Sequence, residues 1–196
     1  MNTILLTGFA PFGGETVNPS WEAVSMLPER IGECRLICQR LPVVYGKCGE
    51  LLRETIRRTA PEIVIAVGVA GGRTAITPEL LAVNYRMASL ADNDGVQFNG
   101  EKIDPAGPDA IMTDLPVREM AEALRANGFP SALSLSAGGY VCNDLYYALL
   151  SGQKEGNYRG AFIHVPPESV LSAGRTAEGL LVCLSTVLEH TARKDI

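Results

Sequence analysis

The stretch "EIVIAVGVA", residues 62–70, indicates the class of fold to which this chain belongs. It is an almost unbroken apolar run, rich in β-branched residues, and it leads into a glycine-rich segment. Runs of this kind are typical of strands that are covered on both faces of a sheet. Further strand-like runs occupy residues 3–8, 35–43, 132–138 and 160–166.

Patterns with helical spacing lie between these runs. They cover residues 19–29, 45–60, 116–128, the segment after Cys142, and 174–194. Because strands and helices alternate in this way, we expect an α/β fold. The predicted architecture is a single three-layer α/β/α domain over residues 1–196, with a mostly parallel, mixed and twisted sheet.

Residues 73–115 depart from this alternation. They begin with a β-like pattern and continue into a long stretch rich in glycine, proline, asparagine and aspartate. Such residues favour turns. We therefore expect a turn-rich insertion, in the form of a hairpin or flap, and not a second domain.

The composition is that of an ordinary globular protein. Of the 196 residues, 46% are hydrophobic and 20% are charged, and the formal net charge is −5. An acidic balance argues against nucleic acid as the main partner. No apolar run approaches the roughly 20 residues that a membrane span requires. The first residues show no features of a signal peptide, so we expect neither membrane insertion nor secretion.

The cysteines indicate a reducing compartment. There are five, an odd number at irregular spacing: Cys34, Cys38, Cys48, Cys142 and Cys183. A disulfide framework of a secreted protein would use an even set. Cys34 and Cys38 are four residues apart, but no second pair of cysteines with close spacing follows, and the chain has only two histidines. We therefore expect no metal site. The interpretation is a cytoplasmic protein with free thiols.

Cys142 stands at a junction within "LSLSAGGYVCNDLYYALL", residues 133–150. The glycines at 138 and 139 end the strand-like part, and a helical pattern begins near the cysteine. A thiol at the start of a helix faces unpaired N–H groups and the positive end of the helix dipole, which lower its pKa. The same place would equally suit a small, buried and inert cysteine.

Functional residues of open α/β sheets gather at the carboxyl ends of the strands. His164 ends one predicted strand, at the same edge of the sheet as Cys142. A histidine in this position is structural about as often as it is functional, but the two residues together favour a catalytic pair. The second histidine, His190, lies on a late helical segment beside basic residues, and we interpret it as structural.

The loop after the first strand, "GFAPFGG" at residues 8–14, is rich in glycine. It lacks the spacing of a dinucleotide fingerprint and the lysine of a phosphate-binding loop, so a nucleotide site is weakly supported. Phe9 and Phe12 flank a proline in this loop. They could belong to the core, although aromatic residues in a loop are better suited to a small apolar pocket.

Several motifs together resemble the pyroglutamyl peptidase I family, also called pyrrolidone carboxyl peptidases. They are "LLTGFAPFGGETVNPSWEAV" (5–24), "VGVAGGRTAITPELLAVN" (67–84), "SAGGYVCNDLYYALL" (136–150) and "GAFIHVPPE" (160–168). They occur in the order and spacing of the family and cover nearly the whole chain. The resemblance implies a cytoplasmic cysteine peptidase that removes N-terminal pyroglutamate (5-oxoproline) from peptides. It also implies a single α/β/α domain, no cofactor and a homotetramer.

The resemblance also implies roles for individual residues. The nucleophile would be Cys142, the general base His164, and the acid that orients the histidine Glu79. The lactam ring of the substrate would lie near a further set of residues: Phe9, Phe12, Asn18, Val69, Tyr140 and Val141.

The sequence departs from the family pattern near this site. Val69 stands where the family usually has glutamine, Ser89 where it usually has arginine, and Ala91 where it usually has proline. Two alternatives therefore stay open beside pyroglutamyl peptidase activity. One is a relative that acts on another blocked or cyclic N-terminal amide, and the other is a catalytically weak relative that binds such a ligand without turnover.

Overall fold

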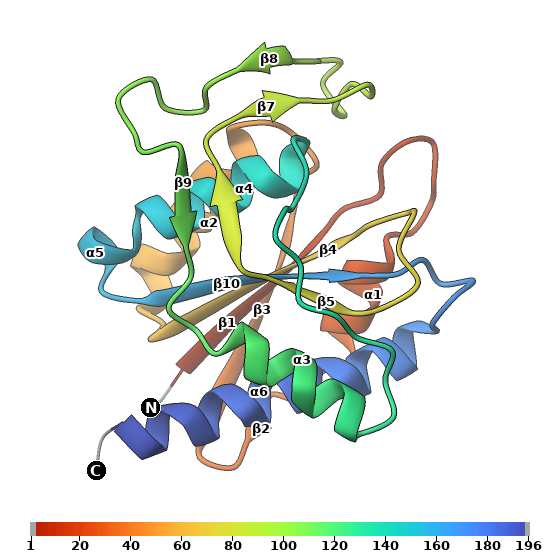
Figure 1. Ribbon diagram of the computed structural model, residues 1–196, viewed down its shortest axis with the longest axis vertical. Helices are drawn as coiled ribbons and strands as arrows, with labels where there is room; N and C mark the ends of the chain where they lie inside the picture. The colour runs from red at the N-terminus through yellow and green to blue at the C-terminus, as the bar shows by residue number, and fades with distance from the viewer. Residues whose placement is uncertain (1–2, 195–196) are drawn as a thin grey trace.

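The computed structural model describes residues 3–194 of the chain, built around one central sheet (Figure 1). The sheet has six strands in the order β2-β3-β1-β4-β10-β5. Its parallel strands are β1 (Thr3–Phe9), β3 (Cys34–Leu41), β4 (Ile63–Val69) and β10 (Arg159–Val165). Antiparallel strands, β2 (Arg30–Ile31) and β5 (Thr77–Glu79), close the two edges. The predicted α/β class and the mostly parallel, mixed sheet are confirmed.

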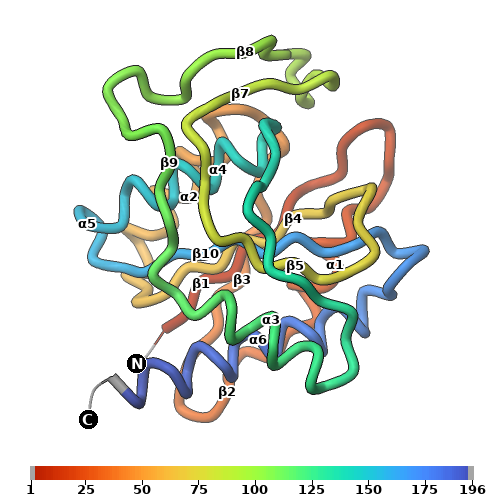
Figure 2. Tube along the Cα trace, in the orientation of Figure 1, coloured from red at the N-terminus to blue at the C-terminus, as the bar shows by residue number. Residues whose placement is uncertain are grey.

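Helices cover both faces of this sheet (Figures 1 and 2). On one side lie α1 (Pro19–Ser25), α3 (Val117–Ala126) and α6 (Ala173–Lys194), and on the other lie α2 (Lys47–Thr59) and α4 (Val141–Ser151), which is followed by the short α5 (Gln153–Gly156). None of the helices within residues 3–194 is long and apolar enough to cross a lipid bilayer.

Strand β4 shows why both faces must be covered. Ile63, Ile65 and Val67 belong to the core beneath α1, α3 and α6, whereas Val64 and Ala66 belong to the core beneath α2 and α4. Successive side chains of a strand point to opposite faces, so a continuous apolar run supplies two cores at once.

Short strands make up much of the segment 73–115. After β5, strand β6 (Leu81–Val83) pairs with β9 (Ala110–Met112), and β7 (Arg86–Met87) pairs with β8 (Asn99–Glu101). Both pairs are antiparallel. They extend from the central sheet past α4, with β7 and β8 at the far end (Figure 1). The β-like pattern and the long turns in this segment are thus accounted for.

One predicted strand, 132–138, is wrong. Within this segment Ser134 makes one isolated bridge, to Glu79, and Ser131, just before it, makes another to Ile76. The hydroxyl of Ser134 accepts a hydrogen bond from the backbone N–H of Ser136 and donates to its carbonyl, which competes with a regular ladder. Leu135 is 63% exposed, so this segment also lacks the cover of a buried strand.

Candidate active site

The pairing of β10 with β4 sets the place of His164. In this parallel register His164 lies beside Gly68, near the carboxyl end of both strands. His164 shares its face of the sheet with Phe162, whose ring packs in the core beneath α2 and α4. The imidazole is therefore turned toward α4 and is almost wholly buried.

Cys142 lies at the same strand end, on the helix that covers this face of the sheet. It lies in the first turn of α4, and its Sγ rests on the backbone of Gly68. A Cβ atom added to Gly68 would lie 2.9 Å from this sulfur and 2.8 Å from the ring of Phe162, closer than real contacts allow. Gly68 thus provides the space in which the thiol sits, on the strand residue that is paired with His164.

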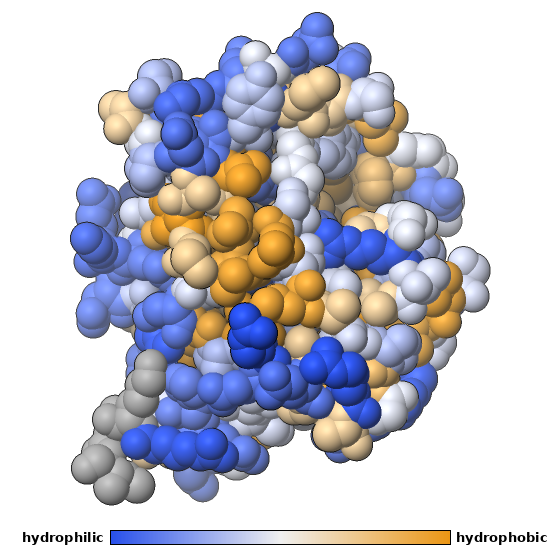
Figure 3. Space-filling model, in the orientation of Figure 1, coloured by the Kyte–Doolittle hydropathy of each residue, from blue (hydrophilic) through white to orange (hydrophobic). Residues whose placement is uncertain are grey.

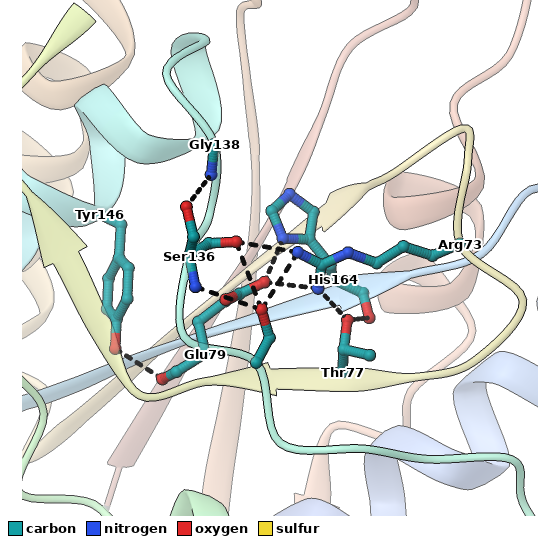
Figure 4. Close-up of polar contacts among 8 residues, drawn as sticks. Arg73, Thr77, Glu79, Ser136, Gly138, Tyr146 and His164 are labelled. Atoms are coloured by element: carbon teal, nitrogen blue, oxygen red, sulfur yellow. Dashed lines mark hydrogen bonds and ion pairs between the residues drawn. The ribbon is translucent and has the colours of Figure 1, made fainter.

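Glu79 completes a chain of side chains from the edge of the sheet. It lies on β5, which pairs with β10. Its Oε1 is 2.7 Å from Nδ1 of His164, and its side chain is fully buried (Figure 4). Because a carboxylate accepts and does not donate, Nδ1 carries the proton. Nε2 of His164 is then free to accept a proton.

The pKa values of Glu79 and of His164 are both lowered in this buried pair. Burial alone would raise the pKa of Glu79, but the hydrogen bonds from His164 and Ser134, together with the charge of Arg73, outweigh it, and the pKa is lowered. Burial also lowers the pKa of His164, more than Glu79 raises it. At neutral pH the pair is therefore a carboxylate beside a neutral imidazole, the form that can act as a base.

The thiol behaves differently from the sequence expectation. Burial raises the pKa of Cys142 to about 12, and the negative charge of Glu79 acts in the same direction. A backbone hydrogen bond at the helix start does lower this pKa, as expected, but burial of the sulfur outweighs it. Cys142 rests as a thiol, so any reaction at its sulfur requires a base.

The backbone ahead of Cys142 is shaped by two glycines. Gly138 has a φ of 82°, in the left-handed region that favours glycine. A Cβ on Gly139 would lie 2.5 Å from the carbonyl oxygen of Met87, so the two backbones touch. No side chain caps α4 at Tyr140. The first N–H groups of a helix have no partner within the helix, and here they lie next to the thiol.

A small apolar pocket opens beside Cys142. Its lining residues are Phe9, Phe12, Asn18, Val43, Val69, Tyr140, Val141 and Cys142. The structure thus brings together, around one cavity, every residue that the family resemblance assigned to substrate binding, and it adds Val43. None of the lining residues is charged.

Two of these residues shape the pocket in recognisable ways. The ring of Phe12 packs against that of Tyr140 at 6.2 Å between centroids. Asn18 caps α1, because its Oδ1 accepts from the N–H of Ser20 at 3.1 Å. Its Nδ2 donates to the carbonyl of Ala10 at 2.9 Å. Asn18 therefore holds the loop that carries Phe12 in place.

The sequence analysis missed two residues at this site. Gly68 lies within the apolar run 62–70, and its pairing with His164 depends on the sheet register, which the sequence does not reveal. Arg73, in the glycine-rich turn that follows this run, contacts Glu79 at 2.6 Å. A single basic residue at the end of a glycine-rich strand loop was the available signal. Within residues 3–194, no group of three or more His, Cys, Asp or Glu side chains is arranged to hold a metal ion.

The positions at which the sequence departs from the family lie close by. Val69 lines the apolar pocket. Ser89 lines a second cleft, together with Gly138 and Gly139. Arg86 lies three residues before Ser89 and is the positive charge nearest to it in the sequence. Its side chain makes an ion pair with Asp144 of α4 at 2.6 Å.

The chain is similar in sequence to proteins of one known family. A family model described as "Pyroglutamyl peptidase" matches residues 2–191. The pyrrolidone-carboxylate peptidase of Bacillus amyloliquefaciens is 46% identical over 173 residues, which cover 86% of this chain and 80% of that protein. The enzyme of the same name from Cupriavidus necator is 40% identical over 206 residues, covering 98% and 95%.

Solved structures give the same result. The crystal structure of pyroglutamyl peptidase I from Bacillus amyloliquefaciens superposes with a TM-score of 0.90 at 41% identity, covering 95% of this chain and 94% of that one. Pyrrolidone carboxyl peptidase from Thermococcus litoralis gives a TM-score of 0.92 at 32% identity, covering 99% and 96%. The family model, the related sequences and the solved structures agree, and this chain belongs to the pyroglutamyl peptidase family.

Proposed function

We propose that this protein is a cysteine peptidase that removes an N-terminal pyroglutamyl (5-oxoproline) residue from peptides, with Cys142 as nucleophile, His164 as base and Glu79 as its orienting acid. One observation carries the proposal. The buried pair of Glu79 and His164 lies in register with Gly68, and the sulfur of Cys142 rests on that glycine, beside an apolar pocket.

Acylation would begin with proton transfer from the Cys142 thiol to Nε2 of His164. The sulfur attacks the carbonyl carbon of the pyroglutamyl residue, and the carbonyl oxygen becomes an oxyanion. Free N–H groups at the start of α4 would stabilise this oxyanion. The C–N bond then breaks, and the imidazolium gives its proton to the leaving amine of the second residue. The product on the enzyme is a 5-oxoprolyl thioester.

Deacylation would use the same groups with water. His164 takes a proton from the water as the oxygen attacks the thioester carbon, the C–S bond breaks, and the proton returns to the sulfur. Free 5-oxoproline leaves. Glu79 stabilises the imidazolium in both stages through Nδ1, and does not itself make or break a bond to substrate.

The pocket suits a pyroglutamyl group. This group has no charged α-amine, because its nitrogen is part of the lactam ring. An apolar cavity that contains no carboxylate would accept the ring and would give a charged N-terminus no partner. Phe9, Phe12 and Tyr140 supply the apolar walls.

The direct test is release of a fluorescent amine from a pyroglutamyl arylamide, run beside prolyl and alanyl arylamides. We expect hydrolysis of the pyroglutamyl compound alone. Hydrolysis of a different cyclic or blocked amide in its place would favour the divergent relative, and binding of pyroglutamate without any turnover would favour the weak homologue.

We further propose that the protein assembles as a homotetramer in the cytoplasm. Support for assembly comes from apolar side chains gathered over β6 and β9 on one face of the molecule (Figure 3). Met87, Met112 and Leu135 are among the exposed apolar residues. Support for the compartment comes from the cysteines, all five of which are free thiols. Light scattering after size-exclusion chromatography tests the first proposal, and cell fractionation the second.

A further inference from the structure

Arg73 occupies a fixed place beside the catalytic pair. It follows β4 in a tight turn, in which its N–H donates to the carbonyl of Ala70 at 3.0 Å. The N–H of Ala70 donates in turn to the carbonyl of Val165, one residue after His164, at 3.0 Å. The turn that carries Arg73 is thus attached to the end of the strand that carries the histidine, and the arginine side chain is only 26% exposed.

The two terminal nitrogens of Arg73 have different partners (Figure 4). Nη1 donates to Oε1 of Glu79 at 2.6 Å and also contacts Oγ1 of Thr77. Nη2 donates to Oγ of Ser134 at 3.2 Å and to the carbonyl of Ser136 at 2.9 Å. One side chain therefore joins the acid of the catalytic pair to the loop that leads to Cys142.

The contact with Glu79 has a particular consequence. Arg73 and His164 both donate to the same oxygen, Oε1. The other oxygen, Oε2, is buried and has no hydrogen-bond partner among residues 3–194. His164 and Arg73 therefore hold the orientation of this carboxylate through Oε1, and the hydroxyl of Ser134 is a further hydrogen-bonding group beside it.

The contact between Arg73 and Ser136 also affects the backbone that leads to Cys142. Oγ of Ser136 accepts the N–H of Gly138 at 3.2 Å. Gly138 and Gly139 form the turn before the first residues of α4, whose N–H groups we assign to the oxyanion. Loss of the Arg73 side chain would therefore release the loop that positions these N–H donors, as well as the carboxylate of Glu79.

We infer that Arg73 is a positioning residue for the hydrolysis: its forked guanidinium aligns Glu79 with His164 and holds the loop before Cys142. This inference rests on the proposed function. The charged and titratable groups that face His164 are Glu79 from β5, Cys142 from α4 and Arg73 itself. Arg73 opposes Glu79, because its charge lowers the pKa of both His164 and Cys142.

Two variants separate the charge of Arg73 from its fork. Arg73→Gln removes the charge, so the pKa of His164 rises and the acid limb of the kcat/KM profile moves to higher pH. Arg73→Lys keeps a charge but offers one nitrogen in place of two. We expect its acid limb to stay in place and its kcat to fall about 10- to 100-fold, since small displacements of reacting groups have effects of that size. Because Arg73 does not line the apolar pocket, KM should change little in both variants.

Arg58→Gln, at an exposed arginine of α2, is the matched control and should match wild type. A second readout is the rate at which iodoacetamide alkylates Cys142 as a function of pH. Loss of the Arg73 charge raises the pKa of the thiol, so Arg73→Gln should be alkylated more slowly than wild type at each pH. This readout needs no substrate, so it tests Arg73 even if the wild-type protein proves inactive on pyroglutamyl compounds.

The inference would be overturned by an Arg73→Gln variant with a wild-type acid limb and wild-type alkylation. It would equally be overturned if Arg73→Lys kept full kcat, because the fork would then be unnecessary. Circular dichroism shows whether each variant is folded. If Arg73→Gln does not fold, the kcat of Arg73→Lys decides the question alone.

Discussion

Within the catalytic group, the three side chains should not be equally important. His164→Ala should lose nearly as much activity as removal of the nucleophile, because His164 takes the proton from the thiol in the proposed mechanism. Glu79→Gln should retain roughly 10- to 100-fold more activity than His164→Ala, because the acid acts only through the histidine. Measurement of kcat for both variants at one pH checks this order. Equal and modest losses would show that His164 is structural and that another base operates.

The pocket residues differ in their exposure to substrate. Phe9 is buried in the core, whereas the ring of Phe12 is partly exposed and forms a wall with Tyr140. Phe12→Ala should therefore raise KM for a pyroglutamyl arylamide by at least roughly tenfold, and more than Phe9→Leu does. Kinetics of Phe12→Ala that match wild type would remove this loop from the binding site.

At the scale of elements, the departures from the family pattern lie at the end of β4 and in the segment after β7. Ser89 borders the cleft beside Gly138 and Gly139, so Ser89→Arg would bring a positive charge toward the oxyanion. We expect an increase in kcat of up to about 100-fold. Val69→Gln should act on KM instead, because Val69 lines the pocket of the lactam ring. An unchanged kcat in Ser89→Arg would show that position 89 does not face the reacting carbonyl.

Arg86, on β7, stabilises the fold and does not take the place of the arginine that the family usually has at position 89. It makes an ion pair with Asp144, which is 4% exposed, and its guanidinium lies 4.9 Å from the ring centre of Phe98. Arg86→Ala should leave kcat nearly unchanged but reduce the free energy of unfolding by about 3 kcal/mol, since it leaves a buried carboxylate unpaired. Urea unfolding of both proteins measures this change. A large loss of kcat in a fully stable variant would reverse the assignment.

The elements also show what the sequence could and could not predict. Strands such as β4 and β10 were predictable because their apolar runs are continuous, and the apolar stripes of α2 and α6 were equally clear. The segment 132–138 misled because Leu133 and Leu135 alternate with serines as in a strand. Those serines instead bond to Arg73 and to their own backbone. That outcome depends on a side chain some 60 residues away in the sequence, and periodicity carries no information about such a contact.

At the scale of the whole molecule, we propose that the chain folds as one domain, with residues 73–115 as an insertion. The observation in support is that β5, within this segment, forms an edge of the central sheet. Thermal unfolding should then show one transition, with the fluorescence of Trp21 and the far-ultraviolet circular dichroism changing together. Two separate transitions would contradict a single cooperative unit.

The central claim is that Cys142 attacks the pyroglutamyl carbonyl and carries the acyl group. Enzyme quenched in acid during turnover of a pyroglutamyl arylamide, then digested and mapped by mass spectrometry, tests it most directly. We predict a 5-oxoprolyl group on the peptide that contains Cys142, and its absence from Cys142→Ser, which should fold normally and have almost no activity. An acyl group on Cys38 or another thiol, or wild-type turnover by Cys142→Ser, would contradict the account.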